Sequence, residues 1–158
     1  MKKSDPGASV DIVVRDSNVL DMRIIQTSQM KATLAKFPEV VQMDGTYRLN
    51  KSGMPLYALV VEDEHGVGQL AALVLTRGEC AVNIRTMLEH LKAGNPALEK
   101  TAVFIVDKDF AEISAIKAVF PQVCLCTLDF LIHSLWKISV VLRCDTVSER
   151  HCAVSKLL

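Results

Sequence analysis

The chain is short, rich in apolar residues and electrically balanced. It has 158 residues, of which 50% are apolar, and its 18 lysines and arginines balance 18 aspartates and glutamates. A chain of this size fits one domain with a buried core. The charges are interspersed rather than gathered into a basic stripe, so strong nonspecific binding of nucleic acid by this chain alone is not expected.

The lengths of the apolar runs and the number of cysteines indicate the cellular environment of the protein. No apolar run reaches the roughly 18 to 20 residues that a membrane-spanning helix requires, so we expect an intracellular protein without membrane contact. An odd number of cysteines in apolar surroundings is typical of reduced core thiols rather than of a disulfide framework. The cysteines are Cys80, Cys124, Cys126, Cys144 and Cys152.

The N-terminal part of the sequence predicts a mobile end, a hairpin and a helix. Residues 1–9 offer nothing to pack and are expected to be mobile. The runs 10–15 and 20–26 flank three turn-forming residues, which favours a strand hairpin. Ser28 is expected to cap a helix that Pro38 ends.

From residue 39 onward the pattern is dense in strands. The runs 40–47, 55–62 and 68–76 are separated by turn-forming Asn, Asp, Ser and Gly, so an antiparallel meander is predicted. Apolar residues at helical spacing then predict a helix around residues 84–91, which Gly94 stops.

The remaining sequence alternates between strands and helices. The continuous apolar run 102–106 is typical of a strand covered on both faces, and it ends at Asp107. A helix over 113–120 and a short strand over 123–128 follow, before a largely apolar segment at 130–142. This order predicts an α/β fold of the RNase H-like type, with a mixed five-stranded sheet flanked by helices and preceded by the hairpin and helix.

The elements group into one domain. We expect this domain to cover residues 10–143, after the mobile residues 1–9. Residues 144–158 are expected to form a C-terminal helix or tail, because Thr146 and Glu149 have the spacing of a capping box.

Two aspartates stand at the ends of apolar strands. Asp44 precedes Gly45, which permits a close backbone approach, and Asp107 ends the next buried strand, with Asp109 two residues later. If the two strands are neighbours, the carboxylates converge and could hold Mg²⁺ ions about 3.5 to 4 Å apart for in-line phosphoryl displacement. Alternatively, Asp107 or Asp109 caps the helix that begins at Phe110.

Three segments closely resemble one known domain family. They are FPEVVQMDGTYRLN (residues 37–50), FIVDKD (104–109) and AIKAVFP (115–121). They resemble the transposase-derived RNase H-like domain of the SWIM-type zinc-finger (ZSWIM) proteins, relatives of the MULE transposases, and the resemblance extends over roughly residues 10–137. The Asp-x-Thr-Tyr and Ala-Ile-x-x-Val-Phe-Pro elements are its specific part.

The resemblance implies roles for the aspartates and shows two departures. It aligns Asp44 with the first catalytic aspartate of the family and Asp107 with the second, with Asp109 as the competing choice. The third acid of the transposases follows a long insertion, whereas here 29 residues follow Asp129, and the surroundings of Glu149 do not match the third-acid motif. Asp129 also replaces a histidine that related domains place three residues after a cysteine.

Two carboxylates alone hold metal and neutralise phosphate charge weakly, so catalysis is not expected. We assign no working catalytic residue and no cofactor, and treat Asp44, Asp107 and Asp109 as vestigial candidates. Asp44 and Asp107 are the metal candidates, with Mg²⁺ as the metal if the site is active.

The leading hypothesis is a non-catalytic module of a nuclear regulatory or scaffold protein, with unidentified protein partners and DNA association in a longer protein. One alternative is a Mg²⁺-dependent DNA nuclease or transposase-type enzyme that uses Asp44 and Asp107. A second alternative is a pure interaction module that binds a partner or another copy of itself.

Overall fold

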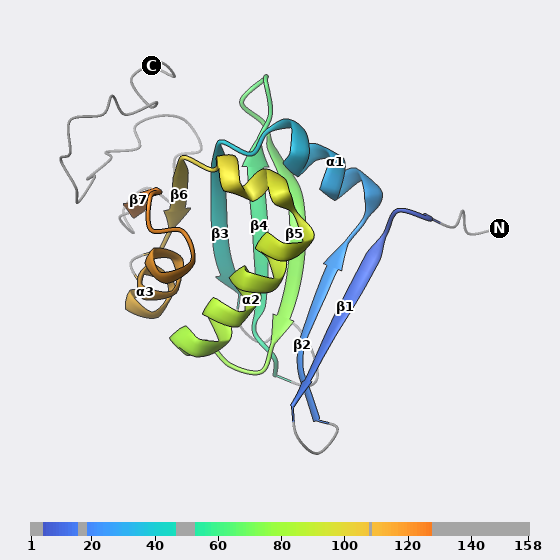
Figure 1. Ribbon diagram of the computed structural model, residues 1–158, viewed down its shortest axis with the longest axis vertical. Coiled ribbons are helices and arrows are strands. Elements are labelled where there is room, and N and C mark those ends of the chain that lie inside the picture. Colours follow the sequence, from blue (N-terminus) through green and yellow to red (C-terminus); the bar gives the residue numbers. More distant parts are fainter. Residues whose placement is uncertain (1–4, 16–18, 47–52, 108, 128–158) are drawn as a thin grey trace.

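The computed structural model in Figure 1 describes residues 5–15, 19–46, 53–107 and 109–127. The expected C-terminal helix or tail at 144–158, the apolar segment at 130–142 and the candidates Asp129 and Glu149 lie outside these ranges. The elements follow in this order: β1 (Ser9–Arg15), β2 (Val19–Gln26), α1 (Ser28–Lys36), β3 (Val40–Thr46), β4 (Leu56–Glu62), β5 (Gly68–Thr76), α2 (Ala81–Gly94), the 3₁₀ helix η1 (Pro96–Lys100), β6 (Val103–Val106), α3 (Phe110–Val119) and β7 (Cys124–Thr127).

The strands form one mixed sheet in the order β1-β2-β5-β4-β3-β6-β7. The predicted meander is present, because β4 pairs antiparallel with both β3 and β5. β6 joins β3 in parallel, and β7 joins β6 in parallel. The strand β3, which carries Asp44, therefore has an antiparallel neighbour on one side and a parallel neighbour on the other.

The prediction of five strands is wrong, since the sheet already has seven strands in the described part of the chain. The hairpin β1–β2 is present but does not stand apart from the sheet. β2 pairs antiparallel with β5, from Met22 opposite Thr76 to Ile25 opposite Leu73. The hairpin thus continues the edge of the meander, and the sheet gains two strands.

The start of α1 differs by one residue from the prediction. The N-cap is Thr27, whose extended backbone precedes the helix and whose side chain accepts a hydrogen bond from the Met30 N–H at 3.1 Å. Ser28 is already helical, and its N–H donates to the Asp5 carboxylate at 3.0 Å. A hydroxyl on the residue before the first turn satisfies a backbone donor that the helix leaves open.

The described helices lie on one face of the sheet, with α1 and α2 crossing it in front of β2 to β5 (Figure 1). The predicted stripe on α2 is buried, namely Ile84, Met87, Leu88 and Leu91. Alternate residues of β4 meet this helical layer, namely Tyr57, Leu59 and Val61. Together they form a continuous apolar core. None of the helices in the described ranges combines the length and apolar character of a membrane span.

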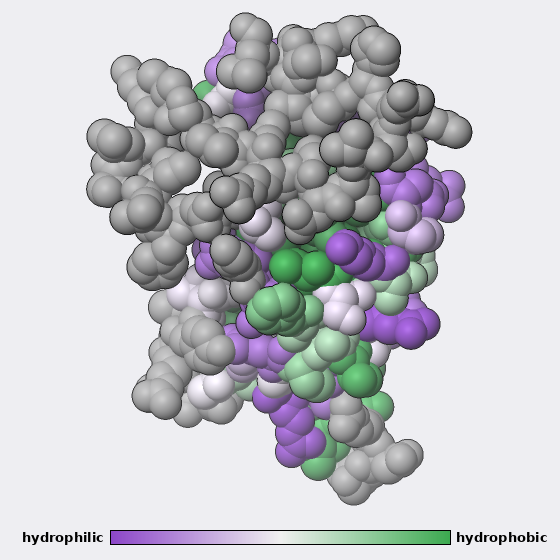
Figure 2. Space-filling view, turned by 90° about the vertical axis from the view of Figure 1, so that its left-hand side faces the viewer, coloured by the Kyte–Doolittle hydropathy of each residue, from purple (hydrophilic) through white to green (hydrophobic). Residues whose placement is uncertain are grey.

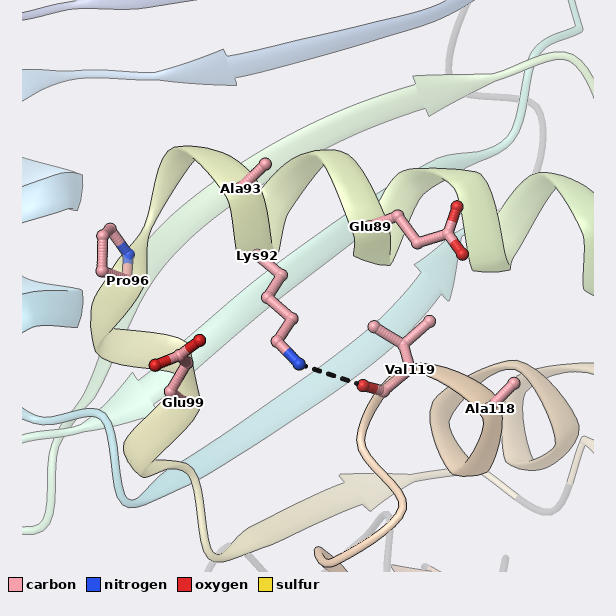
Figure 3. A pocket seen from close by; sticks show the side chains of 7 residues that line it. All are labelled: Glu89, Lys92, Ala93, Pro96, Glu99, Ala118 and Val119. Carbon is pink, nitrogen blue, oxygen red and sulfur yellow. Dashed lines mark hydrogen bonds between the residues drawn. The ribbon is translucent and has the colours of Figure 1, made fainter.

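The helix α3 packs against α2 beside the parallel strands. The rings of Phe104 in β6 and Phe120 after α3 have centroids 5.1 Å apart. A hollow of about 500 Å³ lies between the two helices. Lys92 of α2 is one of the residues that line it (Figure 3). Its ammonium donates to the Val119 carbonyl at 3.2 Å and lies over the Phe120 ring. A cation thus satisfies a carbonyl at the C-terminal end of α3.

The cysteines follow the prediction only in part. Cys126 in β7 is buried and Cys124 is half-buried, but Cys80 at the start of α2 is exposed. On the side of the molecule that faces the viewer in Figure 2, the described residues form a hydrophobic patch among hydrophilic ones.

Candidate functional site

Asp44 and Asp107 lie at the same end of two neighbouring parallel strands. β3 and β6 are in register from Val40 opposite Val103 to Gln42 opposite Ile105. Asp44 lies two residues beyond Gln42, and Asp107 lies two residues beyond Ile105 and directly after the end of β6. The carboxyl ends of parallel strands meet at one edge of a sheet, and both aspartates are exposed there.

Asp109 has a structural role that the sequence analysis had left open. It is the N-cap of α3, and its Oδ1 accepts hydrogen bonds from the N–H groups of Ala111 at 2.6 Å and Glu112 at 3.3 Å. Asp107, in contrast, is not the cap of this helix. The carboxylate of Asp109 is therefore committed to the first turn of α3, where it also meets the positive end of the helix dipole.

Glu112 is a further acid at this edge of the sheet, which the sequence pattern did not predict. It lies in the first turn of α3 and is only 5% exposed. A Cβ placed on Gly45 would lie 3.5 Å from its Oε1 and 2.9 Å from the ring of Tyr57. The Glu112 side chain therefore lies over Gly45, the residue that follows Asp44 in β3. The missing side chain of Gly45 leaves the space for it.

The position of Glu112 shifts its carboxyl group towards the protonated form. Its Oε2 is buried and makes no hydrogen bond with any residue in the described ranges. Burial, and then the negative charges of Asp109, Asp107, Asp44 and Glu79, raise the pKa of Glu112 to about 7. A carboxyl group in such a place keeps its proton because the charged form loses its hydration.

The pKa values of two neighbouring groups, Tyr57 and Glu79, are raised by the same causes. Burial, followed by the charges of Glu112 and Asp109, raises the pKa of the Tyr57 hydroxyl. Burial and the charge of Asp109 also raise the pKa of Glu79, which lies between β5 and α2. The carboxyl ends of β3 and β6 thus form the centre of an acidic cluster in which added negative charge is costly.

The geometry limits what the cluster can bind. Among the described residues, no three His, Cys, Asp or Glu side chains are arranged to hold a metal ion together. Asp44 and Asp107 each follow a buried residue, Met43 and Val106, and successive residues of a strand point to opposite faces of the sheet. Glu112, in contrast, lies with Gly45 on the face that the helices cover. Within the described ranges, Asp44 and Asp107 are the residues that could hold an Mg²⁺ ion here, and an ion with so few protein ligands would keep several waters.

The sequence carried a weak signal for Glu112. Glu112, Ala115 and Ile116 are the buried residues of α3, and they have the spacing of one helical face. An acid on an otherwise apolar face is unusual, because an ionised carboxylate is seldom buried without a partner. Only the packing of α3 over Gly45, however, reveals which groups surround it.

The sheet order, the parallel β3–β6 pair and the acidic strand ends agree with one comparison. The model of the family "Zinc finger SWIM domain-containing protein 1/3, RNaseH-like domain" matches residues 1–126. The chain belongs to this family. The resemblance inferred from the three sequence segments is thereby confirmed, and the seven-stranded sheet is the form that this RNase H-like domain takes here.

The match with the RNase H-like family covers both strands of the candidate site. It extends from the N-terminus to the third residue of β7 and so includes Asp44, Asp107 and Glu112. The catalytic and metal-binding roles of Asp44, Asp107 and Asp109 stay predictions, because family membership alone assigns no role to a residue.

Proposed function

We propose that this RNase H-like domain is a transposase-derived, non-catalytic module of a nuclear regulatory or scaffold protein. In a longer protein it would associate with protein partners and with DNA. The kinship with MULE transposases, the nuclear location and the lack of catalysis go beyond family membership and form the proposal itself.

The observation that carries the proposal is that Asp109 and Glu112, the acids near Asp44 and Asp107, both have structural roles. Asp109 binds the first turn of α3, and Glu112 lies buried over Gly45 with a pKa of about 7. In a two-metal enzyme, ionised carboxylates converge on shared cations. Here one nearby acid holds a helix in place and the other favours its protonated form, which supports a structural use of the former catalytic edge.

A cleavage assay tests the proposal. The full chain is incubated with labelled single- and double-stranded DNA in Mg²⁺ or Mn²⁺, with EDTA as the blank. We expect no metal-dependent cleavage above the blank. Metal-dependent cleavage that disappears in Asp44→Asn and Asp107→Asn, but persists in Asp11→Asn, would overturn the proposal, because Asp11 is an exposed acid on the distant β1 strand.

One observation favours a second candidate function, a Mg²⁺-dependent nuclease or strand-transfer enzyme. The parallel pairing of β3 with β6 supports it, because Asp44 and Asp107 then follow at the same end of neighbouring strands, and metal-dependent phosphoryl transfer requires carboxylates that converge. The same assay separates the two functions, since only the enzyme would cleave DNA in a manner that depends on both aspartates.

A further inference from the structure

The strand β1 is the outer strand at one edge of the sheet. It pairs with β2 on one side, and β7 lies at the opposite edge. Within the described ranges, no strand pairs with its other side. An edge strand presents alternating N–H and C=O groups that can form a ladder with another extended chain.

The side chains of β1 make this edge unusually apolar. Val10 and Ile12 are each 56% exposed and Val14 is 50% exposed, while Val13 points the other way and packs against the core. These three exposed residues alternate, so they form one apolar stripe along the strand.

The edge also lacks most devices that prevent pairing. β1 has seven residues, Ser9–Arg15, with neither proline nor lysine among them. The register passes from Val13 opposite Met22 to Val14 opposite Leu20, so the extra residue of the bulge belongs to β2. β1 itself is regular, and a regular, apolar edge is a template for strand addition.

The charges of β1 favour a second copy of the same strand. Asp11 lies near its start and Arg15 at its end. In an antiparallel pair with Val13 on the two-fold axis, residue 11 of each copy stands opposite residue 15 of the other. Residue 12 then stands opposite residue 14, so apolar residues meet apolar residues. A parallel, in-register pair would instead bring like charges together.

We propose that two copies of this chain associate by antiparallel pairing of their β1 strands about Val13, which joins their sheets into one. The contact is isologous, because each copy offers the same strand. It does not depend on whether the acidic edge at β3 and β6 is catalytic, since β1 lies at the far side of the sheet.

Analytical ultracentrifugation of the full chain tests this inference. Because a contact limited to one strand is small, the protein is measured from roughly 10 to 500 μM. We expect a monomer–dimer equilibrium whose dissociation constant rises about tenfold or more in Ile12→Glu. This variant should fold, because Arg23 of β2 is opposite Ile12 and suits a carboxylate. Val82→Glu, on an exposed residue of α2, is the matched control and should leave the dimer intact.

A charge exchange tests the register. Asp11→Lys should weaken the dimer, and the added change Arg15→Glu should restore it. For the wild type, hydrogen exchange at β1 should slow as the concentration rises, which tests the proposal even if a variant fails to fold.

Three results would overturn the inference: a monomer at every concentration, a dimer that Ile12→Glu and Val82→Glu affect equally, or β1 amides protected to the same degree at all concentrations. The last result would mean that a segment of the same chain covers the edge. Failure of any of these tests leaves the DNA-cleavage result, and hence the proposed function, unaffected.

Discussion

At the scale of single residues, the candidate site depends on the contact of Gly45, Tyr57 and Glu112. Gly45 has no side chain, and this leaves room for the Tyr57 ring and the Glu112 carboxyl at the end of β3. Its Oε2 is buried without a hydrogen bond to any described residue, and burial of this kind disfavours the charged form of the Glu112 carboxyl group. The raised pKa of Glu112 is therefore a measurable consequence of its burial.

Protonation of Glu112 should make the stability of the fold depend on pH. Its ordinary pKa of 4.5 is raised to about 7 in the folded state, so between these values the folded state binds a proton that the unfolded state has released. The resulting stability is fully present below pH 4.5 and is lost as the pH rises through 7, by about 3 kcal/mol at most.

Urea unfolding at pH 5 and pH 8 measures this effect. Glu112→Gln should lose less stability than the wild type between the two pH values, and it should be the more stable protein at pH 8. Glu99→Gln, at an exposed acid within η1, should follow the wild type. Equal pH dependence in wild type and Glu112→Gln would show that the carboxyl is hydrated.

A methyl group at Gly45 should destabilise the fold. The new Cβ of Gly45→Ala would lie 2.9 Å from the Tyr57 ring, which is buried and has little room to move. We expect a loss of about 1 to 3 kcal/mol in the free energy of unfolding, measured in urea. Gly94→Ala is the control, since a Cβ there meets nothing within 4 Å and should be neutral or slightly stabilising. A neutral Gly45→Ala would contradict the close packing.

At the scale of elements, α3 is held at both ends by named groups. Asp109 caps its first turn, and Lys92 of α2 binds the Val119 carbonyl at its last turn (Figure 3). The sequence predicted the helix and left Asp107 and Asp109 as alternative caps. Only the backbone at residue 109, which is extended before the first turn, selects between them.

Loss of the cap should weaken the fold by about 1 kcal/mol, the usual cost when alanine replaces a capping aspartate. Asp109→Ala removes the acceptor for the Ala111 and Glu112 N–H groups. Asp109→Asn retains an acceptor oxygen and should keep most of the stability in thermal or urea unfolding. If both variants lose the same stability, the charge rather than the cap is what matters.

At the scale of the whole molecule, local sequence patterns predicted single elements better than they predicted which distant strands pair. The meander, the buried stripe of α2 and the apolar strand before Asp107 each follow from periodicity within a short window, and the structure contains all three. The prediction of five strands failed because the union of β2 with β5 joins residues about 50 positions apart. No local pattern records such a pairing.

The candidate site shows the same division. The sequence predicted aspartates at the ends of two strands, but only the structure shows that these strands, β3 and β6, are parallel neighbours. Glu112 escaped prediction because its burial depends on how α3 crosses the end of β3. Tertiary packing therefore decides which acids gather and which form they favour.

The central claim is that Asp44 and Asp107 act as a pair of carboxylates, since no third metal-binding acid joins them among the described residues. A titration of the full chain with Mn²⁺, followed by paramagnetic broadening of backbone NMR signals, tests it directly. We predict weak binding, in the millimolar range or above, because two carboxylates hold a divalent cation poorly. Saturable binding in the micromolar range that broadens Gly45 and Asp107, and that Asp44→Asn abolishes, would contradict the account.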